Sequence, residues 1–228
     1  MSPPVRPKVA AFDIIGTTFS IEPLRPRLTL LDLPPAALDA WYAAGLRDAF
    51  ALAATGGFEP FRQVLDGALE QVAAKMGVQT TSASREEVLE GLKELPPHPD
   101  AGEALETLAG AGIRVLAVSN GAAALTRHLF RQSGLDSFVE RVISVEDVRR
   151  SKPAREVYDF AAREAGVEPG TVALVATHPW DIHGAKSAGW LGAYVARGVP
   201  YPSGVMRPPD VEGETLAEVT ARLAALPR

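Results

Sequence analysis

The chain contains no cysteine and only four histidines among its 228 residues. Without cysteine the protein has no disulfides, no thiolate nucleophile, no cysteine-ligated zinc and no iron–sulfur cluster. The four histidines are scattered along the chain and leave little room for a histidine-ligated zinc site. Any covalent chemistry therefore depends on an oxygen or nitrogen nucleophile.

Long apolar runs and a strong charge of either sign are also lacking. No stretch approaches the ~20 apolar residues that a membrane span needs, and no signal-like apolar segment follows the N-terminal residues. With 23 Lys+Arg against 28 Asp+Glu, the net charge is −5, which argues against a nucleic-acid or anionic-membrane surface. We therefore expect a cytoplasmic protein with no nucleic-acid and no membrane partner.

The first part of the chain contains one strand and then only helices. A short apolar run over 9–12 predicts a buried strand that ends at Asp13. Apolar residues at helical spacing predict two helices between 34 and 77. Ser84 and Glu87 have the spacing of a capping box, which predicts the start of a third helix at Ser84.

After a Pro-rich segment at 95–99, strands and helices alternate. This alternation implies a parallel sheet covered by helices on both faces. We predict an α/β protein with a core domain of residues 1–18 and 98–228, and a helical insertion of residues 19–97. The predicted strands are 113–118, 139–145, 172–176 and 193–195, the helices are 101–109, 121–132, 152–165 and 182–188, and a Pro-rich loop covers 200–209.

Polar side chains stand at or just after the predicted strand ends, where open parallel sheets gather their functional groups. Each has an ordinary structural explanation as a turn former, a helix cap or a solvated lysine. Together, at one edge of one sheet, they predict a functional site. They are Asp13, Ser119 with Asn120, Lys152, and the segment 178–181.

Four segments form an ordered set of motifs: Asp13-Ile14-Ile15-Gly16-Thr17, Val118-Ser119-Asn120-Gly121, Ser151-Lys152-Pro153 and Trp180-Asp181-Ile182-His183-Gly184-Ala185. Each motif is weak alone, but the set resembles the four motifs of the haloacid dehalogenase (HAD) superfamily over nearly the whole chain. The resemblance implies a Rossmann-like parallel-sheet core, the HAD fold. It also implies that the insertion after the first motif is an all-helical cap.

The resemblance implies a role for each polar residue. Asp13 is the expected nucleophile, which forms an aspartyl ester or an acyl phosphate, and Lys152 keeps it ionised and oriented. Backbone N–H groups at Ser119 and Asn120 are expected to bind an anionic group of the substrate. The hydroxyl groups of Ser119 and Thr17 are expected to position Asp13 or its ester.

Two acids that phosphatases of the superfamily use are absent. Ile15 stands at the position of their general acid, and the fourth motif keeps Asp181 alone of its two acids. Phosphoryl transfer needs the charge of Mg²⁺, which prefers oxygen ligands, whereas halide leaves carbon without metal or general acid. In both respects the chain resembles the type II L-2-haloacid dehalogenases, which implies that Asp13 displaces halide and that Asp181 and Lys152 help activate the water.

The chain also departs from those dehalogenases. They have Tyr at the position of Ile15, a halide-binding Arg at the position of Tyr42, and Ser, Ser and Asn where residues 176–178 are Ala, Thr and His. Asn120 is still available as a halide contact. Four arginines of the insertion are candidates to replace the missing cation: Arg25, Arg27, Arg47 and Arg62.

Aromatic and apolar residues are candidates for the walls of a small substrate site. Tyr42, Phe61 and Trp180 could form these walls beside Ile15, although Phe61 also fits the core of the cap. His178 stands between a strand end and Asp181, where it could act as a base near neutral pH. Alternatively, it only hydrogen-bonds within its loop.

We therefore predict a metal-independent hydrolase of short 2-haloacids that needs no cofactor and forms an aspartyl ester on Asp13. The resemblance further implies a homodimer. Two alternatives stay open, a diverged HAD-type phosphatase and a non-catalytic HAD-like protein that binds a small anion at Ser119 and Asn120. Mg²⁺-dependent turnover of a phosphoester would favour the first, and binding without turnover would favour the second.

Overall fold

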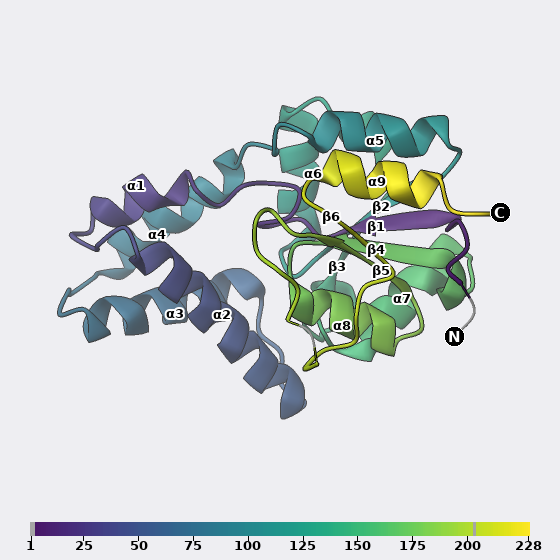
Figure 1. Ribbon diagram of the computed structural model, residues 1–228. Helices are drawn as coiled ribbons and strands as arrows, with labels where there is room; N and C mark the ends of the chain where they lie inside the picture. Colours follow the sequence, from purple (N-terminus) through teal and green to yellow (C-terminus); the bar gives the residue numbers. More distant parts are fainter. Residues whose placement is uncertain (1–2, 203) are drawn as a thin grey trace.

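The computed structural model describes residues 3–202 and 204–228. These residues include one six-stranded parallel sheet in the order β3-β2-β1-β4-β5-β6 (Figure 1). The predicted α/β fold with a parallel-sheet core is confirmed, and β1 lies inside the sheet, between β2 and β4. The strands are β1 (Val9–Phe12), β2 (Arg114–Ser119), β3 (Arg141–Ser144), β4 (Val172–Ala176), β5 (Leu191–Val195) and β6 (Val211–Gly213).

Helices cover both faces of the sheet (Figure 1). Along β1, Ala10 and Phe12 belong to one buried hydrophobic cluster, and Val9 and Ala11 belong to the other. Because both faces of β1 are buried, its sequence is apolar throughout instead of alternating. The first cluster includes side chains of α5 (Ala101–Gly110), α6 (Ala123–Gln132) and α9 (Leu216–Ala224), and the second includes side chains of α7 (Arg155–Ala165) and α8 (Pro179–Ser187).

The segment between β1 and α5 is helical and gathers to one side of the sheet, at the left of Figure 1. Its two longest helices pack closely at Gly45, where a Cβ would lie 2.6 Å from Cδ2 of Leu65. Trp41 Nε1 donates a hydrogen bond to the Leu65 carbonyl at 2.7 Å. The helices are α1 (Leu24–Thr29), α2 (Ala37–Ala54), α3 (Phe61–Lys75) and α4 (Ser82–Glu90), followed by the 3₁₀ helix η1 (Gly91–Glu94).

The chain enters and leaves this helical segment through two adjacent stretches. Phe19 and Pro97 form an antiparallel bridge. The His98 N–H donates to the carbonyl of Thr18 at 2.9 Å. The division that we propose, with a core of residues 1–18 and 98–228 and a cap of residues 19–97, has its boundaries at this paired crossing.

The predicted start of α4 is wrong. Thr81 is the N-cap, because its backbone is extended and its hydroxyl accepts a hydrogen bond from the Ser84 N–H at 3.1 Å. Ser84 Oγ accepts one in return from the Thr81 N–H at 3.0 Å. Ser84 is therefore the third residue of the helix and not its cap, and Glu87 has no part in the capping box.

Other boundaries also differ from the predictions. α6 and α7 begin at Ala123 and Arg155, later than predicted, whereas α8 begins earlier, at Pro179. Proline suits the first turn of a helix, and this start places Asp181 in that turn. Two α-helices and one strand were not predicted: α1, α9 and β6. The predicted loop at 200–209 contains no helix or strand in its described residues, and Ser203 lies outside them.

Candidate active site

Asp13 is the first residue after β1, and only 7% of its side chain is exposed. Its N–H donates to the Val175 carbonyl of β4 at 3.0 Å, which extends the ladder between the two strands by one residue. Its own carbonyl accepts a hydrogen bond from Thr18 Oγ1 at 2.6 Å. The backbone of Asp13 is therefore held by β4 on one side and by the following turn on the other.

Lys152 joins the two carboxylates of the site. Its Nζ donates to Oδ1 of Asp13 at 2.8 Å, to Oδ2 of Asp181 at 2.6 Å and to the Val118 carbonyl at 3.0 Å. The side chain is fully buried, and the three acceptors match the three donors of an ammonium group. The Lys152 N–H also donates to Oδ1 of Asn120 at 2.9 Å, so both the backbone and the side chain of Lys152 are fixed.

Burial and charge act in opposite directions on these groups. Burial alone would raise the pKa of Asp13, but Lys152 and His178 outweigh it and hold that pKa below 3.8. Burial would likewise lower the pKa of Lys152, but the two carboxylates outweigh it and the pKa is raised. The pKa of Asp181 is raised by its burial, which Lys152 only partly offsets. Asp13 is thus the more readily ionised of the two carboxyls.

Tyr158 contacts the other oxygen of Asp181. The sequence does not predict this contact, because Tyr158 belongs to none of the motifs. Its hydroxyl donates to Oδ1 of Asp181 at 2.5 Å, and burial raises its pKa well above 10, so it stays a donor. The ring can approach because residue 184 is glycine, where a Cβ would lie 2.5 Å from the Tyr158 hydroxyl. Both oxygens of Asp181 are therefore occupied inside the protein.

Two threonines support the second oxygen of Asp13. Thr17 Oγ1 donates to Oδ2 of Asp13 at 2.6 Å. It accepts a hydrogen bond from the Thr177 N–H at 3.0 Å, and the two threonine hydroxyls lie 3.1 Å apart. Thr177 is a second residue whose place in the site was not predicted, although it stands in the altered fourth motif. Together the two threonines connect the ends of β1 and β4.

Ser119 and Asn120 are buried at the end of β2 and start the turn into α6. Ser119 Oγ accepts a hydrogen bond from the Gly121 N–H at 2.9 Å. Asn120 contacts the site through its hydrogen bond with the backbone of Lys152. Their predicted role in binding the anionic group of a substrate stays a prediction.

Two side chains approach the backbone carbonyl of Ile15, which lies in the turn after Asp13. Tyr42 of α2 donates its hydroxyl to this carbonyl at 3.2 Å. Nε2 of His178 lies 3.2 Å from the same carbonyl and 3.5 Å from Oδ2 of Asp13. The turn needs Gly16, which has φ +89° and whose added Cβ would lie 3.0 Å from Nε2 of His178.

Aromatic rings from three helices surround His178. Its ring stacks on Trp180, with centroids 5.3 Å apart and an interplanar angle of 16°, and lies 6.0 Å from the ring of Tyr42. Phe61 meets Tyr42 edge to face at 6.3 Å, and Phe50 meets Trp180 in the same way at 5.1 Å. Of the predicted wall residues, Tyr42 and Trp180 thus lie beside His178, and Phe61 contacts Tyr42.

The four arginines that we considered as substitutes for a halide-binding cation are all engaged elsewhere. Arg25 pairs with Glu22, and Arg27 pairs with Glu94. The remaining two make the same kind of contact: Arg47 with Asp48, and Arg62 with Glu86 and Glu90. These contacts hold the four arginines among the cap helices.

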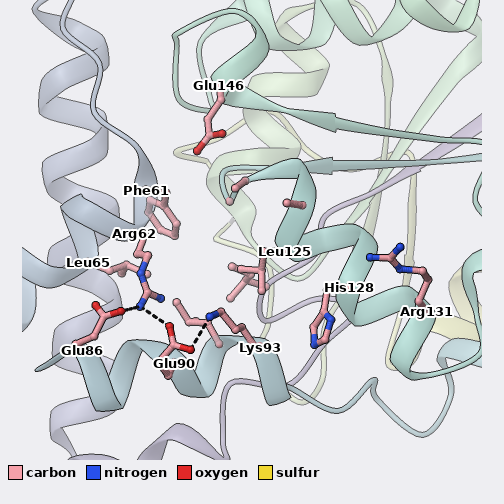
Figure 2. A pocket seen from close by; sticks show the side chains of 15 residues that line it. Phe61, Arg62, Leu65, Glu86, Glu90, Lys93, Leu125, His128, Arg131 and Glu146 are labelled. Carbon is pink, nitrogen blue, oxygen red and sulfur yellow. Dashed lines mark hydrogen bonds and ion pairs between the residues drawn. The ribbon is translucent and has the colours of Figure 1, made fainter. Parts of the chain in front are cut away.

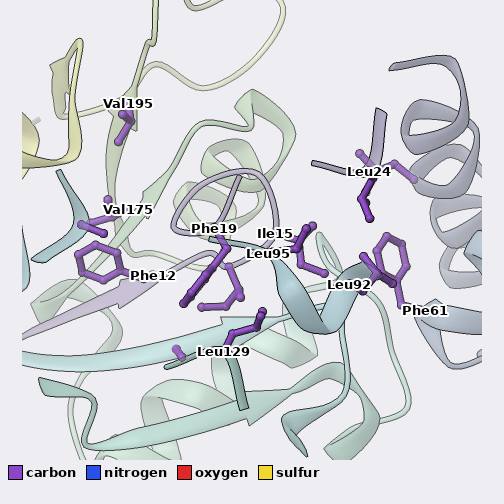
Figure 3. Close-up of a cluster of buried hydrophobic side chains, with 14 of the residues drawn as sticks. Phe12, Ile15, Phe19, Leu24, Phe61, Leu92, Leu95, Leu129, Val175 and Val195 are labelled. Carbon is purple, nitrogen blue, oxygen red and sulfur yellow. The ribbon is translucent and has the colours of Figure 1, made fainter. Parts of the chain in front are cut away.

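A cavity of about 650 Å³ lies between the cap helices and α6 (Figure 2). Its apolar lining includes Ile15, Phe61, Leu65 and Leu125, and Arg62 lies at its edge, where it pairs with two carboxylates. Figure 3 shows Ile15 and Phe61 among the buried side chains that join the cap to the core. Asp13 does not line this cavity, but its near neighbour Ile15 does.

Two features are absent from residues 3–202 and 204–228. No three His, Asp or Glu side chains lie together as a metal-binding group. None of the helices in these residues has the length and apolar character needed to cross a membrane.

The fold and the buried aspartate–lysine site define a hydrolase of the HAD type. The family model described as haloacid dehalogenase-like hydrolase matches residues 7–189, so the chain belongs to this family. It is 29% identical over 167 residues to (S)-2-haloacid dehalogenase 4A of Burkholderia cepacia, covering 73% of this chain and 72% of that protein. It is 25% identical over 190 residues to haloacetate dehalogenase H-2 of Moraxella sp. (strain B), covering 82% and 84%.

Solved structures agree with this assignment. The structure is similar to that of a dehalogenase with an intermediate complex, with a TM-score of 0.88, 25% identity, and coverage of 98% of this chain and 99% of that one. The L-2-haloacid dehalogenase from Xanthobacter autotrophicus has the same fold, with a TM-score of 0.87, 22% identity, and coverage of 96% and 98%.

Proposed function

We propose that this protein is a hydrolytic dehalogenase of short 2-haloacids in which Asp13 is the nucleophile. The observation that carries the proposal is the clamp of Asp13 between the buried ammonium of Lys152 and the hydroxyl of Thr17. This clamp keeps the carboxylate ionised, oriented and largely free of water, as a nucleophile at carbon requires. The similarity to (S)-2-haloacid and haloacetate dehalogenases supports the same reaction class.

The reaction has two steps. In the first, Oδ2 of Asp13, the oxygen on the side of His178, attacks C2 of the substrate, and the C–halogen bond breaks with its electron pair on the halide. In the second, water attacks Cγ of the ester, and the Cγ–Oδ2 bond breaks to release a 2-hydroxyacid. Lys152 lies 2.8 Å from Oδ1, where it stabilises the negative charge that develops on this oxygen.

The carboxylates of the site argue against the phosphatase alternative. Mg²⁺ in a HAD-type phosphatase would need carboxylate oxygens near the nucleophile. Here both oxygens of Asp181 are engaged inside the protein, one by Lys152 at 2.6 Å and the other by Tyr158 at 2.5 Å. Ile15 is buried in the apolar cluster and has no proton to transfer.

The test is a halide-release assay with purified protein on 2-chloropropionate, chloroacetate and bromoacetate, with and without chelator. We expect release that the chelator does not affect, and a loss of about 10⁴-fold or more in Asp13→Asn. A single turnover in ¹⁸O-labelled water should place the label in Asp13. Chelator-sensitive turnover of a generic phosphoester, or binding of both compound types without turnover, would favour one of the alternatives instead.

A further inference from the structure

Hydrolysis of an ester on Asp13 needs a group that takes a proton from the attacking water. Asp181 was expected to help in this step, but both of its oxygens are engaged, one by Lys152 at 2.6 Å and the other by Tyr158 at 2.5 Å. Its side chain is also fully buried. A carboxylate in this position holds Lys152 in place, and each of its oxygens already accepts a hydrogen bond from the protein.

His178 is placed for this proton transfer. Its side chain is 18% exposed, and Nε2 lies 3.5 Å from Oδ2 of Asp13. A water that attacks Cγ of Asp13 can therefore also contact Nε2. Stacking on Trp180 fixes the plane of the ring, and Gly16 leaves room for its edge. An imidazole can accept and return a proton near neutral pH.

Nε2 of His178 can hydrogen-bond to water without leaving the Ile15 carbonyl unpaired. In the resting site Nε2 lies 3.2 Å from the Ile15 carbonyl, and the Tyr42 hydroxyl donates to that same carbonyl. Burial and the nearby carboxylates raise the pKa of Tyr42 well above 10, so its hydroxyl remains a donor. When Nε2 accepts a proton from water, the carbonyl therefore keeps the hydrogen bond from Tyr42.

We propose that His178 is a catalytic residue for hydrolysis of the ester, and this inference rests on the proposed function. Nε2 of neutral His178 takes a proton from water while the water oxygen bonds to Cγ of Asp13. When the Cγ–Oδ2 bond breaks, the departing alkoxide takes that proton and leaves as the 2-hydroxyacid. The new carboxyl of Asp13 then loses its remaining proton to solvent, which restores the starting site.

The charges that face His178 make its role specific to the second step. Asp13 lies at the end of β1, and Tyr42 approaches from α2. Lys152 lies over the ring of Trp180, 5.9 Å from its centroid. Asp181 is hydrogen-bonded to Lys152. Formation of the ester neutralises Asp13, so the carboxylate that lies 3.5 Å from Nε2 in the first step is no longer an anion in the second.

The test compares the first turnover with the steady state in His178→Asn and His178→Phe. Phe keeps a ring to stack on Trp180 but accepts no proton, and Asn keeps polarity without titrating near neutral pH. We expect steady-state turnover to fall by about 10²–10⁴-fold in both variants, and by more than the first release of halide falls. Intact-mass spectrometry should therefore show the covalent ester accumulating.

Detection of the ester and a matched control make the test independent of any one variant's folding. A variant that forms the covalent ester is folded and completes the first step, so its loss of steady-state turnover belongs to the second step. His183→Asn changes a histidine inside α8, whose Nδ1 accepts a hydrogen bond from the Arg207 N–H, and should leave both rates unchanged.

The outcomes separate this inference from the proposed function. If halide is released but His178→Phe turns over at the wild-type rate, or both phases slow equally, His178 is only a wall and this inference is wrong. If the wild-type protein releases no halide and forms no ester, the proposed function fails, and this inference fails with it.

Discussion

Lys152→Met is the substitution whose effect on stability can be worked out most fully from the structure. It removes three hydrogen bonds and leaves two carboxylates in a buried site without their shared cation. Removing one partner of a buried ion pair costs about 3–5 kcal/mol, a large part of the ~5–15 kcal/mol by which domains are stable. We expect a loss of about 3–5 kcal/mol in the free energy of unfolding at pH 7.5, measured by urea denaturation.

The loss should depend on pH in a defined direction. In the wild type the pKa of Asp13 lies below 3.8, so the stability from its ion pair is present above that value and lost only as pH falls through the lowered pKa. The pKa of Lys152 is raised, so its contribution is complete at neutral pH. Without Lys152, burial would act unopposed and raise the pKa of both carboxyls.

The deficit of Lys152→Met should therefore be largest near pH 7.5 and shrink toward about pH 5, as the carboxyls of the variant take up protons. Adding Asp181→Asn to Lys152→Met should recover part of the stability, because it removes one of the two uncompensated charges. The control is Lys93→Met, whose exposed pair with Glu90 is worth about 0–1 kcal/mol. A cost below about 1 kcal/mol for Lys152→Met, or a deficit independent of pH, would refute this account of the site.

Three further predictions concern single contacts. Tyr158→Phe removes the hydrogen bond to Asp181 and leaves a buried acceptor unpaired, so it should cost about 1–3 kcal/mol in urea denaturation; no measurable cost would contradict this. Gly16→Ala places a Cβ 3.0 Å from His178 and should lower kcat/KM for haloacids by about 10²-fold, whereas Gly77→Ala, also at positive φ but in open space, should leave kcat/KM unchanged. Thr81→Ala removes the cap of α4 and should cost about 0.5–2 kcal/mol, visible as a lower Tm with unchanged activity.

The core of the site could be predicted because its residues are tied to strand ends. Asp13, Lys152 and Asp181 follow or lie near the ends of buried strands or the starts of the next helices, and a parallel sheet gathers such positions at one edge. A strand such as β1 can be recognised in the sequence by its apolar run, because both of its faces are buried. The motif order then identifies which polar side chains meet.

Other contacts are not visible in the sequence because they depend on packing between elements. Tyr158 reaches Asp181 from α7 only because Gly184 lets the two helices approach closely. β6 is three residues long, too short for a periodic pattern. The start of α4 was misplaced since Thr81 and Ser84 can both cap a helix, and backbone conformation decided between them.

The two departures from the dehalogenase pattern at positions 15 and 178 are connected through one carbonyl. The Ile15 side chain is buried among apolar residues, so this position has lost any proton-transferring side chain. Its carbonyl, however, receives the Tyr42 hydroxyl and faces the ring of His178. Ile15 thus has no side chain that can transfer a proton, and the backbone of the same turn contacts His178. In our proposal the side chain that transfers a proton beside Oδ2 of Asp13 comes from the end of β4, 3.5 Å away, and not from the turn after β1.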